Sequence, residues 1–435
     1  MEGKRVLKNA SWIIMFQCIQ AVLSLIVTML MARYLGPSNY GVLNYAISVT
    51  AFVIPIAMLG INSVLVQELV HYPDNEGEIL GTSILMSICS SVLCIAGVAV
   101  FVLIANRGEK DTFIVCVLYS VMLIFQSLEL IQYWYQARLL SKYTSITGLV
   151  AYIFVSTYKI LLLMKGMSIH WFALSYSFDH MIIAVTLLFI YYKKGNSKLK
   201  LSSAVGWRIF SKSKYYIIST LMVTLFAQQD KVMLKLMLGN EATGYYSAAV
   251  TCATMSGFIV TAIIDSVRPV IFESRLVSKA AYEQNLTSLY SIIIYFCIVQ
   301  GIFFTLFAKP IIGIIYGTQY GQSVNVLQII IWYSAFSYIG GIRDIWLLSE
   351  NKQKYLIWIN LFGALVNMVL NLILIRIIGI CGAAFASLIT QIFTNIILTF
   401  IIRPISHNND FVFAAINPRY AIRLSKKLLS VLMNK

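Results

Sequence analysis

The chain has 435 residues, of which 59% are hydrophobic and only 11% are charged, and its mean hydropathy is +0.81. This composition excludes an ordinary soluble domain, because such a domain carries far more polar residues. The formal net charge is +16. In so apolar a chain we interpret it as a topology signal and an attraction to anionic lipid headgroups, so nucleic acid is not an expected partner.

Long apolar runs follow one another along almost the whole sequence. A bilayer core of about 30 Å needs about 20 apolar residues per helix. Twelve runs meet this requirement, and they lie near 10–32, 41–66, 80–105, 112–136, 144–164, 168–192, 209–237, 243–266, 286–308, 323–348, 355–375 and 380–402. We therefore predict an all-α, polytopic membrane protein with about twelve transmembrane helices.

A short pattern, L-G-x4-G, occurs twice. It appears as LGPSNYG at 35–41 and as LGNEATG at 238–244, a spacing of 203 residues, each time directly after an apolar run. Each copy predicts that one helix ends at the Leu-Gly turn and that the next begins at the second glycine. Internal repeats of this kind are typical of transporters, and they indicate two halves built to one plan.

The basic residues favour one side of the predicted membrane. With the N-terminus in the cytoplasm, 23 of the 33 Lys and Arg residues fall in cytoplasmic segments, so we expect both termini there. The longest loop, 193–214, carries seven of them and predicts a cytoplasmic linker. It separates an N-terminal six-helix lobe (1–192) from a C-terminal one (209–402), followed by a basic cytoplasmic tail (403–435). A cleft between the two lobes follows from this plan.

The motifs of metal, redox and nucleotide chemistry are missing from the sequence. It contains no C-x-x-C pair, no H-E-x-x-H and no G-x-x-x-x-G-K-[ST]. We therefore expect no metal, no cofactor and no ATP hydrolysis by this chain. Any energy for its function must come from ion gradients, the membrane potential or the substrate.

Polar residues interrupt the run at 209–237. A charge inside a bilayer costs about 2.5–3.5 kcal/mol on insertion scales and therefore usually faces a cavity. Gln228, Lys231 and Lys235 lie at i, i+3 and i+7, so they share one helix face that we expect to line water. Asp230 is adjacent to Lys231 and points about 100° away from it. The alternative is that these charges form internal structural ion pairs.

Two further spans carry candidate binding residues. Arg343 lies beside Asp344 and two glycines, Gly340 and Gly341, which permit close helix approach, and it is the strongest candidate for contact with an anion. In the fourth span, a polar stripe predicts a face turned to a cleft or to the inside of a bundle. Its members are Gln126, Glu129, Tyr133 and Gln136.

Other intramembrane charges allow a purely structural interpretation. Lys159 in the fifth span could contact substrate, or it could simply pair with Asp179 in the sixth. Asp265 and Arg268, at i and i+3, are expected to form an ordinary pair at a helix end. The asparagines and glutamines near the C-terminal end are expected to hydrogen-bond between helices.

The segment from Met31 to Gly41, MARYLGPSNYG, resembles the A-R-x-L-G-P-x-x-Y-G element of the polysaccharide biosynthesis family, the Wzx-type oligosaccharide flippases. Gly60-Ile61-Asn62-Ser63 and Gly379 with Gly382-Ala383-Ala384 also look like elements of that family. Gln67 stands where many relatives carry Arg. The family has no universal catalytic motif. The resemblance therefore implies only turn positions, which are Arg33, Gly36, Pro37 and Gly41, with Gly239 and Gly244 in the second copy of the pattern.

The resemblance implies a MATE-like fold of two six-helix lobes around a cleft whose opening alternates. It also implies that the protein is not an enzyme but a flippase, which moves an undecaprenyl-pyrophosphate-linked sugar repeat unit to the outer leaflet for O-antigen, capsule or related polymers. In this hypothesis Arg343, Lys231 and Lys159 offset the pyrophosphate charge. Gln126, Glu129 and Gln228 then meet sugar hydroxyls.

Two alternatives remain open at this stage. A cation-coupled drug exporter of the same fold would use an acidic membrane site, for which Asp230, Glu129 and Asp179 are available. A membrane sugar polymerase or glycosyltransferase is less favoured, because no D-x-D motif and no large external loop are present.

The expected location is a bacterial cytoplasmic membrane. The expected partners are the lipid-linked oligosaccharide and the bilayer, with a polysaccharide polymerase and chain-length machinery as further candidates. The basic tail, 419–435, is expected to form an amphipathic surface helix.

Overall fold

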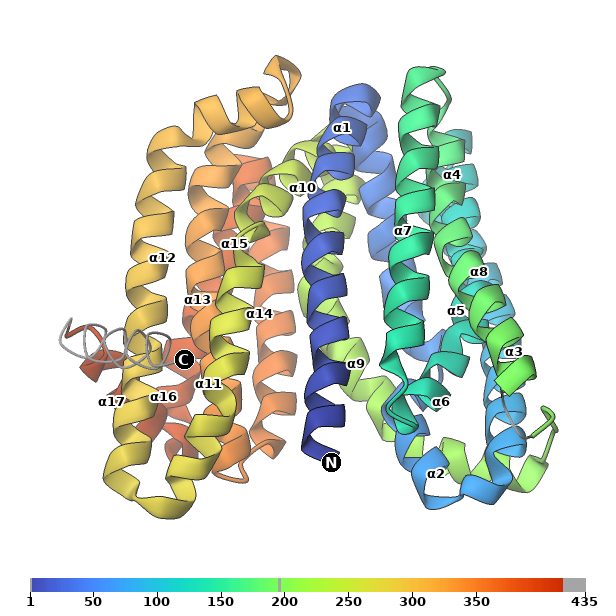
Figure 1. Cartoon of the computed structure of the whole chain (residues 1–435). Helices are drawn as coiled ribbons and strands as arrows, with labels where there is room; N and C mark the ends of the chain where they lie inside the picture. The colour runs from blue at the N-terminus through green and yellow to red at the C-terminus, as the bar shows by residue number, and fades with distance from the viewer. Residues whose placement is uncertain (1, 195–196, 418–435) are drawn as a thin grey trace. The chain divides into compact units, whose positions relative to one another are not determined.

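The computed structural model describes residues 2–194 and 197–417, and within them the regular structure is all helical, without strands (Figure 1). The predicted surface helix at 419–435 lies outside these residues. In chain order the elements are α1 (Glu2–Ala57), η1 (Ile61–Ser63), α2 (Leu65–His71), η2 (Pro73–Asn75), α3 (Glu76–Ala105), α4 (Lys110–Ser120), α5 (Met122–Leu128), η3 (Glu129–Ile131), α6 (Gln132–Ala137), α7 (Ser141–Met164), α8 (Ile169–Lys194), α9 (Ser203–Leu238), α10 (Asn240–Thr254), α11 (Gly257–Val277), α12 (Lys279–Ile315), η4 (Thr318–Tyr320), α13 (Ser323–Ser349), α14 (Lys354–Ile378), α15 (Ile380–Ile392), η5 (Phe393–Ile397), α16 (Leu398–Ile401), η6 (Arg403–Ile405) and α17 (His407–Ala414).

Within the described residues, nine helical segments are long and apolar enough to cross a bilayer. The number rises to ten if α10 and α11, which meet at a bend of 41°, form one span. The chain is thus a multi-pass, all-α membrane protein, as predicted, but the predicted count of twelve is higher. One difference arises because the predicted spans 10–32 and 41–66 both fall largely on α1, which is counted as a single membrane span from Leu23 to Ala57. The other is α9, which is excluded because basic residues and the polar run at 228–231 lower its hydropathy.

Contacts divide the chain into two compact units, Met1–Leu236 and Met237–Lys435. We call them unit 1 and unit 2. The division falls near the end of α9, later than the predicted linker at 193–214, so the linker and most of α9 belong to unit 1. The assignment of six spans to each membrane lobe stays a prediction.

The two copies of the repeated pattern adopt the same backbone turn. Gly36 has φ 70° and ψ 172°, and Gly239 has φ 92° and ψ −169°, a region that is essentially restricted to glycine. The helix resumes directly afterwards, at Pro37 and at Asn240. The prediction that it resumes at the second glycine was therefore wrong by about one turn, because a single glycine suffices to redirect the chain.

The linker is held to unit 1 by close backbone approach at glycines. A Cβ on Gly77 would lie 2.2 Å from the carbonyl oxygen of Lys198, and one on Gly81 would lie 2.4 Å from that of Lys200. The amide of Lys200 donates to the carbonyl of Gly77 over 3.0 Å. Gly60, with φ +63°, similarly admits the backbone of Ser213 from α9. Side chains larger than hydrogen at these positions would push the linker away.

Two buried carboxylates add charge contacts at the same end of unit 1. Glu68 on α2, 1% exposed, accepts from Lys212 Nζ at 2.5 Å and from Arg208 Nε at 3.1 Å. Glu76 at the start of α3 accepts from Arg138 Nη2 at 2.6 Å and from Trp134 Nε1 at 2.7 Å. Burial of a carboxylate is tolerated only with such partners, so these contacts fix the linker and α6 in place.

Unit 2 is built around α13. This helix packs against α10, α12 and α15, and Figure 1 shows α12 and α13 running side by side. The core between them is aliphatic and aromatic, with Tyr290 and Trp346 almost fully buried. Large apolar side chains also remain exposed along α12 and α14, as a lipid-facing surface requires.

Candidate functional site

A carboxylate and an imidazole meet inside unit 1. Glu129 lies in η3, a 3₁₀ turn that interrupts the predicted fourth span, and is 7% exposed. Its Oε2 lies 2.7 Å from Nδ1 of His180 on α8. Gln126, one turn earlier, and Asp179, next to His180, each hold a buried side-chain oxygen without a hydrogen-bond partner in the structure. These residues therefore give α5, η3 and α8 a polar interior with spare acceptors.

Lys159 on α7 is buried against an aromatic ring. It is 8% exposed, and its Nζ lies 3.9 Å from the ring centroid of Tyr176 on α8. Asp179, the partner that the sequence suggested, is not within the 4.0 Å that defines an ion pair. The ring stabilises the ammonium group through its negative face. Asp179 attracts the ammonium group only from beyond ion-pair distance.

The polar run of α9 contacts the rest of unit 1. Gln228 Oε1 accepts from the hydroxyl of Ser48 on α1 at 3.0 Å and from Lys231 Nζ at 3.5 Å. Lys235, whose side chain is 1% exposed, donates to Glu109 Oε2 at 2.5 Å. The predicted water-lining face thus meets protein at Gln228 and Lys235. Lys231 lies half-buried between them, and Asp230 is buried.

Arg343 in unit 2 is held by protein on several sides. Its Nη1 donates to Asn395 Oδ1 at 2.7 Å and to the Thr394 carbonyl at 3.1 Å. Nε and Nη2 both donate to Asp344 Oδ1, at 3.2 and 2.8 Å. Since a guanidinium has five N–H donors, four are already used. The residue that the sequence placed first for anion contact therefore has the fewest free donors.

The contact between Arg343 and Asn395 depends on two backbone features. Residues 393–397 form a π-helical turn, η5, which frees the Thr394 carbonyl from the regular α-helical ladder. On the opposite side, a Cβ at Gly340 would lie 2.6 Å from Asn395 Oδ1, so only glycine lets the two helices approach. Asn395 also donates to the Phe336 carbonyl at 3.0 Å. This polar centre joins α13 to α15 and η5.

Sequence reasoning missed His180, Glu68, Glu76 and Glu109 as partners of charged residues. Glu129 and His180 are 51 positions apart, and no local pattern links them. The pair Asp265 and Arg268, by contrast, was predicted from its spacing and is formed at 2.9 Å. In the described part of the chain, no group of three His, Cys, Asp or Glu residues could hold a metal ion.

The residues at and beside the two repeated turns have structural roles. Tyr34 donates to the Met167 carbonyl at 3.0 Å, which ties the end of the first half of α1 to the α7–α8 turn. Gly41 and Gly244 are buried inside helices, whereas Arg33 is exposed. These positions shape the helix breaks.

The fold and the polar helix interiors define a multi-pass membrane protein with the architecture of multidrug exporters and lipid flippases. The lipid II flippase MurJ in an inward closed conformation is 16% identical and has a TM-score of 0.65, with 94% of this chain and 92% of that chain covered. An inward-facing MATE multidrug transporter of the MOP superfamily is 12% identical, with a TM-score of 0.64 and coverage of 90% and 96%.

The family follows from sequence. Residues 6–274 match the model of the family described as polysaccharide biosynthesis protein, and the chain belongs to this family. The capsular polysaccharide biosynthesis protein CapF of Staphylococcus aureus is 20% identical over 405 residues, which cover 89% of this chain and 96% of CapF.

Proposed function

We propose that this protein is a flippase that moves a lipid-linked oligosaccharide repeat unit from the cytoplasmic to the outer leaflet for assembly of a surface polysaccharide such as capsule or O-antigen. Membership of the polysaccharide biosynthesis family supports the pathway. The similarity of fold to a protein named lipid II flippase supports the type of transport. In this role the chain binds and moves its substrate and catalyses no covalent step.

The observation that carries the proposal is the buried ammonium group of Lys159, which has no carboxylate within ion-pair distance. A buried charge without a direct ion-pair partner is costly inside an apolar bundle, and such charges usually face a cavity where a ligand of opposite charge can neutralise them. A pyrophosphate-linked lipid supplies such a ligand, with about two negative charges.

Lys231 is the second proposed contact, because its only hydrogen bond within the described residues is a long one to Gln228. We place both lysines ahead of Arg343, whose donors are mostly used. Gln126 and Glu129, together with Gln228 and Asp230, are proposed to meet sugar hydroxyls. The spare acceptor oxygen of Gln126 supports this role.

The direction of transport agrees with the membrane potential. Moving one negative charge out of a negative-inside cell is favourable by about 2.3 kcal/mol per 100 mV. No nucleotide is required for a doubly charged head group. We propose that the two lobes open alternately to either side of a bacterial cytoplasmic membrane, with both termini in the cytoplasm, as the distribution of basic residues indicates.

The test is leaflet accessibility in proteoliposomes. A lipid-linked repeat unit is incorporated with the purified full chain, and an impermeant glycosidase scores the exposed fraction over time. We expect protein-dependent exposure of the inner-leaflet pool, whereas protein-free liposomes and liposomes with Lys159→Met stay near the starting fraction. Exposure that does not depend on the protein, with the cognate glycan and a folded chain, would contradict the proposal.

A further inference from the structure

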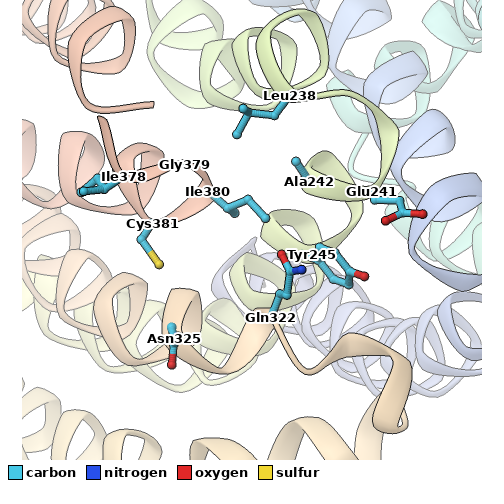
Figure 2. A pocket seen from close by; sticks show the side chains of 10 residues that line it. All are labelled: Leu238, Glu241, Ala242, Tyr245, Gln322, Asn325, Ile378, Gly379, Ile380 and Cys381. Carbon is cyan, nitrogen blue, oxygen red and sulfur yellow. The ribbon is translucent and has the colours of Figure 1, made fainter. Parts of the chain in front are cut away.

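A pocket of about 520 Å³ lies in unit 2, and none of the residues of the Arg343 centre lines it (Figure 2). It is built where three pairs of helices meet: α9 with α10, η4 with α13, and α14 with α15. Figure 2 shows Ile380 extending from the last of these turns into the space near Ala242 and Gln322. The volume falls within the range of about 300–1,000 Å³ that small-molecule sites occupy.

The polar lining of this pocket consists of neutral and acidic groups. It includes the amides of Gln322 and Asn325, the carboxylate of Glu241 and the side chain of Tyr245. No lysine or arginine is among the lining residues. A phosphate or pyrophosphate would therefore meet a carboxylate without a compensating cation, which disfavours an anionic ligand.

The amide side chains are available to a ligand. Gln322 and Asn325 are exposed, and the structure shows no hydrogen bond from either side chain. Tyr245, by contrast, is fixed: its ring meets that of Tyr320 edge to face, with centroids 6.1 Å apart, and Tyr320 is fully buried. A fixed aromatic ring beside free amide and carboxylate groups suits a ligand that has both C–H faces and many hydroxyls.

The end of unit 2 that carries the pocket is poor in basic residues. Among the basic residues of unit 2 that the structure describes, Lys309 and Arg376 are near it, whereas the opposite end carries Arg275, Lys279, Lys352, Lys354 and Arg403. By the positive-inside bias, the pocket opens on the extracytoplasmic side.

We propose that this pocket is a saccharide subsite, which holds one or two neutral sugar residues of the glycan on the side where transport releases it. The proposal rests on the proposed function, which supplies a glycan at that membrane face. Glu241, Gln322 and Asn325 hydrogen-bond to hydroxyls, and Tyr245 packs against the face of a sugar ring. The pyrophosphate is excluded from this subsite by its charge.

Cys381 provides a direct readout, because it lines the pocket and is partly exposed. The purified full chain is treated with N-ethylmaleimide, and alkylation of each cysteine is followed by peptide mass spectrometry. The probe is the repeat-unit oligosaccharide released from the polymer by mild acid, free of lipid and pyrophosphate. We expect it to slow alkylation at Cys381 but not at Cys89, which is exposed on α3 in unit 1. Inorganic pyrophosphate should protect neither.

Variants separate binding from folding. Gln322→Ala and Asn325→Ala should each weaken half-maximal protection by about three- to tenfold, as loss of one hydrogen bond predicts. Gln353→Ala, the same change at an exposed position at the opposite end of unit 2, should leave it unaltered.

Three outcomes overturn the subsite. The first is no protection of Cys381 by the oligosaccharide in a preparation that flips the lipid-linked substrate. The others are protection in Gln322→Ala and Asn325→Ala that equals that of the wild type, or protection of Cys381 by pyrophosphate. Loss of flipping with saccharide protection intact would instead contradict the proposed function and leave the subsite standing.

Discussion

Lys159 in unit 1 and Arg343 in unit 2 are both buried cations in apolar helices, but their surroundings differ. Arg343 makes four hydrogen bonds to Asp344, Thr394 and Asn395. Lys159 has an aromatic ring at 3.9 Å and no carboxylate within 4.0 Å. The comparison teaches that intramembrane charge alone does not mark a binding residue. What distinguishes the two is whether the protein itself already neutralises the charge.

The largest expected effect is on transport, from Lys159→Met. Removal of a charge-assisted contact to a phosphate predicts a loss of about 1.5–3 kcal/mol in substrate stabilisation, which is at least about tenfold in the rate of exposure at limiting substrate. The unfolding midpoint in detergent should change little, because no direct ion pair to a protein carboxylate is broken. Lys165→Met, at the exposed end of the same helix, is the matched control. Equal flipping by both variants would remove Lys159 from the site.

The next effect is on stability, from Arg343→Met. This change leaves the buried oxygens of Asn395 and Thr394 without their donor, and we expect a loss of about 2 kcal/mol in unfolding free energy. The ion pair with Asp344 adds little, because that carboxylate is 48% exposed. Transport per folded molecule should stay near the wild-type value. Arg268→Met, which removes an exposed pair, should leave stability unchanged. A stable Arg343→Met protein that cannot transport would reverse the comparison.

The same backbone turn occurs once in each unit, and we expect substitution of its glycine to destabilise both units to a similar extent. Gly36→Ala and Gly239→Ala each force a side chain into a region restricted to glycine, and each should cost about 1–3 kcal/mol. Thermal unfolding of the purified variants measures this. Gly313→Ala, at an open helical position on α12, should be neutral or slightly stabilising. A large effect at only one of the two turns would show that the repeats no longer share a structural role.

The smallest effect concerns the pair formed by the partly exposed Glu109 and the buried Lys235. Burial raises the pKa of Glu109, but the hydrogen bonds from Lys235 and Thr112 outweigh it and hold the pKa below its ordinary value. The pair therefore stabilises the protein above the unfolded-state pKa, and the contribution is lost as pH falls through the lowered folded-state pKa.

The test compares thermal unfolding of the wild type and of Glu109→Gln between about pH 3 and pH 7. This range runs from about one unit below the ordinary pKa of a glutamate to neutrality. We expect the wild type to be slightly more stable at neutral pH and the two curves to converge at the acid end. A gap that stays constant with pH would mean that ionisation of Glu109 does not contribute. The effect is small because the carboxylate is 41% exposed.

Part of the candidate site was predictable from sequence. Because the surrounding sequence is apolar, four charged residues could be recognised as candidate functional residues: Glu129, Lys159, Lys231 and Arg343. Their partners were not predictable, because Glu129 and His180 meet across 51 positions and Arg343 and Asn395 across 52. The order of the candidates also changed, since only the positions of acceptors show which cation is already neutralised.

The sequence by itself determined the class of the protein, because transfer of long apolar runs into lipid is a local property of composition and length. It also determined the paired helix breaks, because only glycine adopts the backbone angles found at Gly36 and Gly239. The tertiary structure alone decided how the chain divides, since α9 is held to unit 1 by Glu68 and Ser48 through contacts between distant segments. It also decided which buried charges are neutralised, because electrostatic pairing depends on distances of a few ångströms that no spacing along the chain fixes.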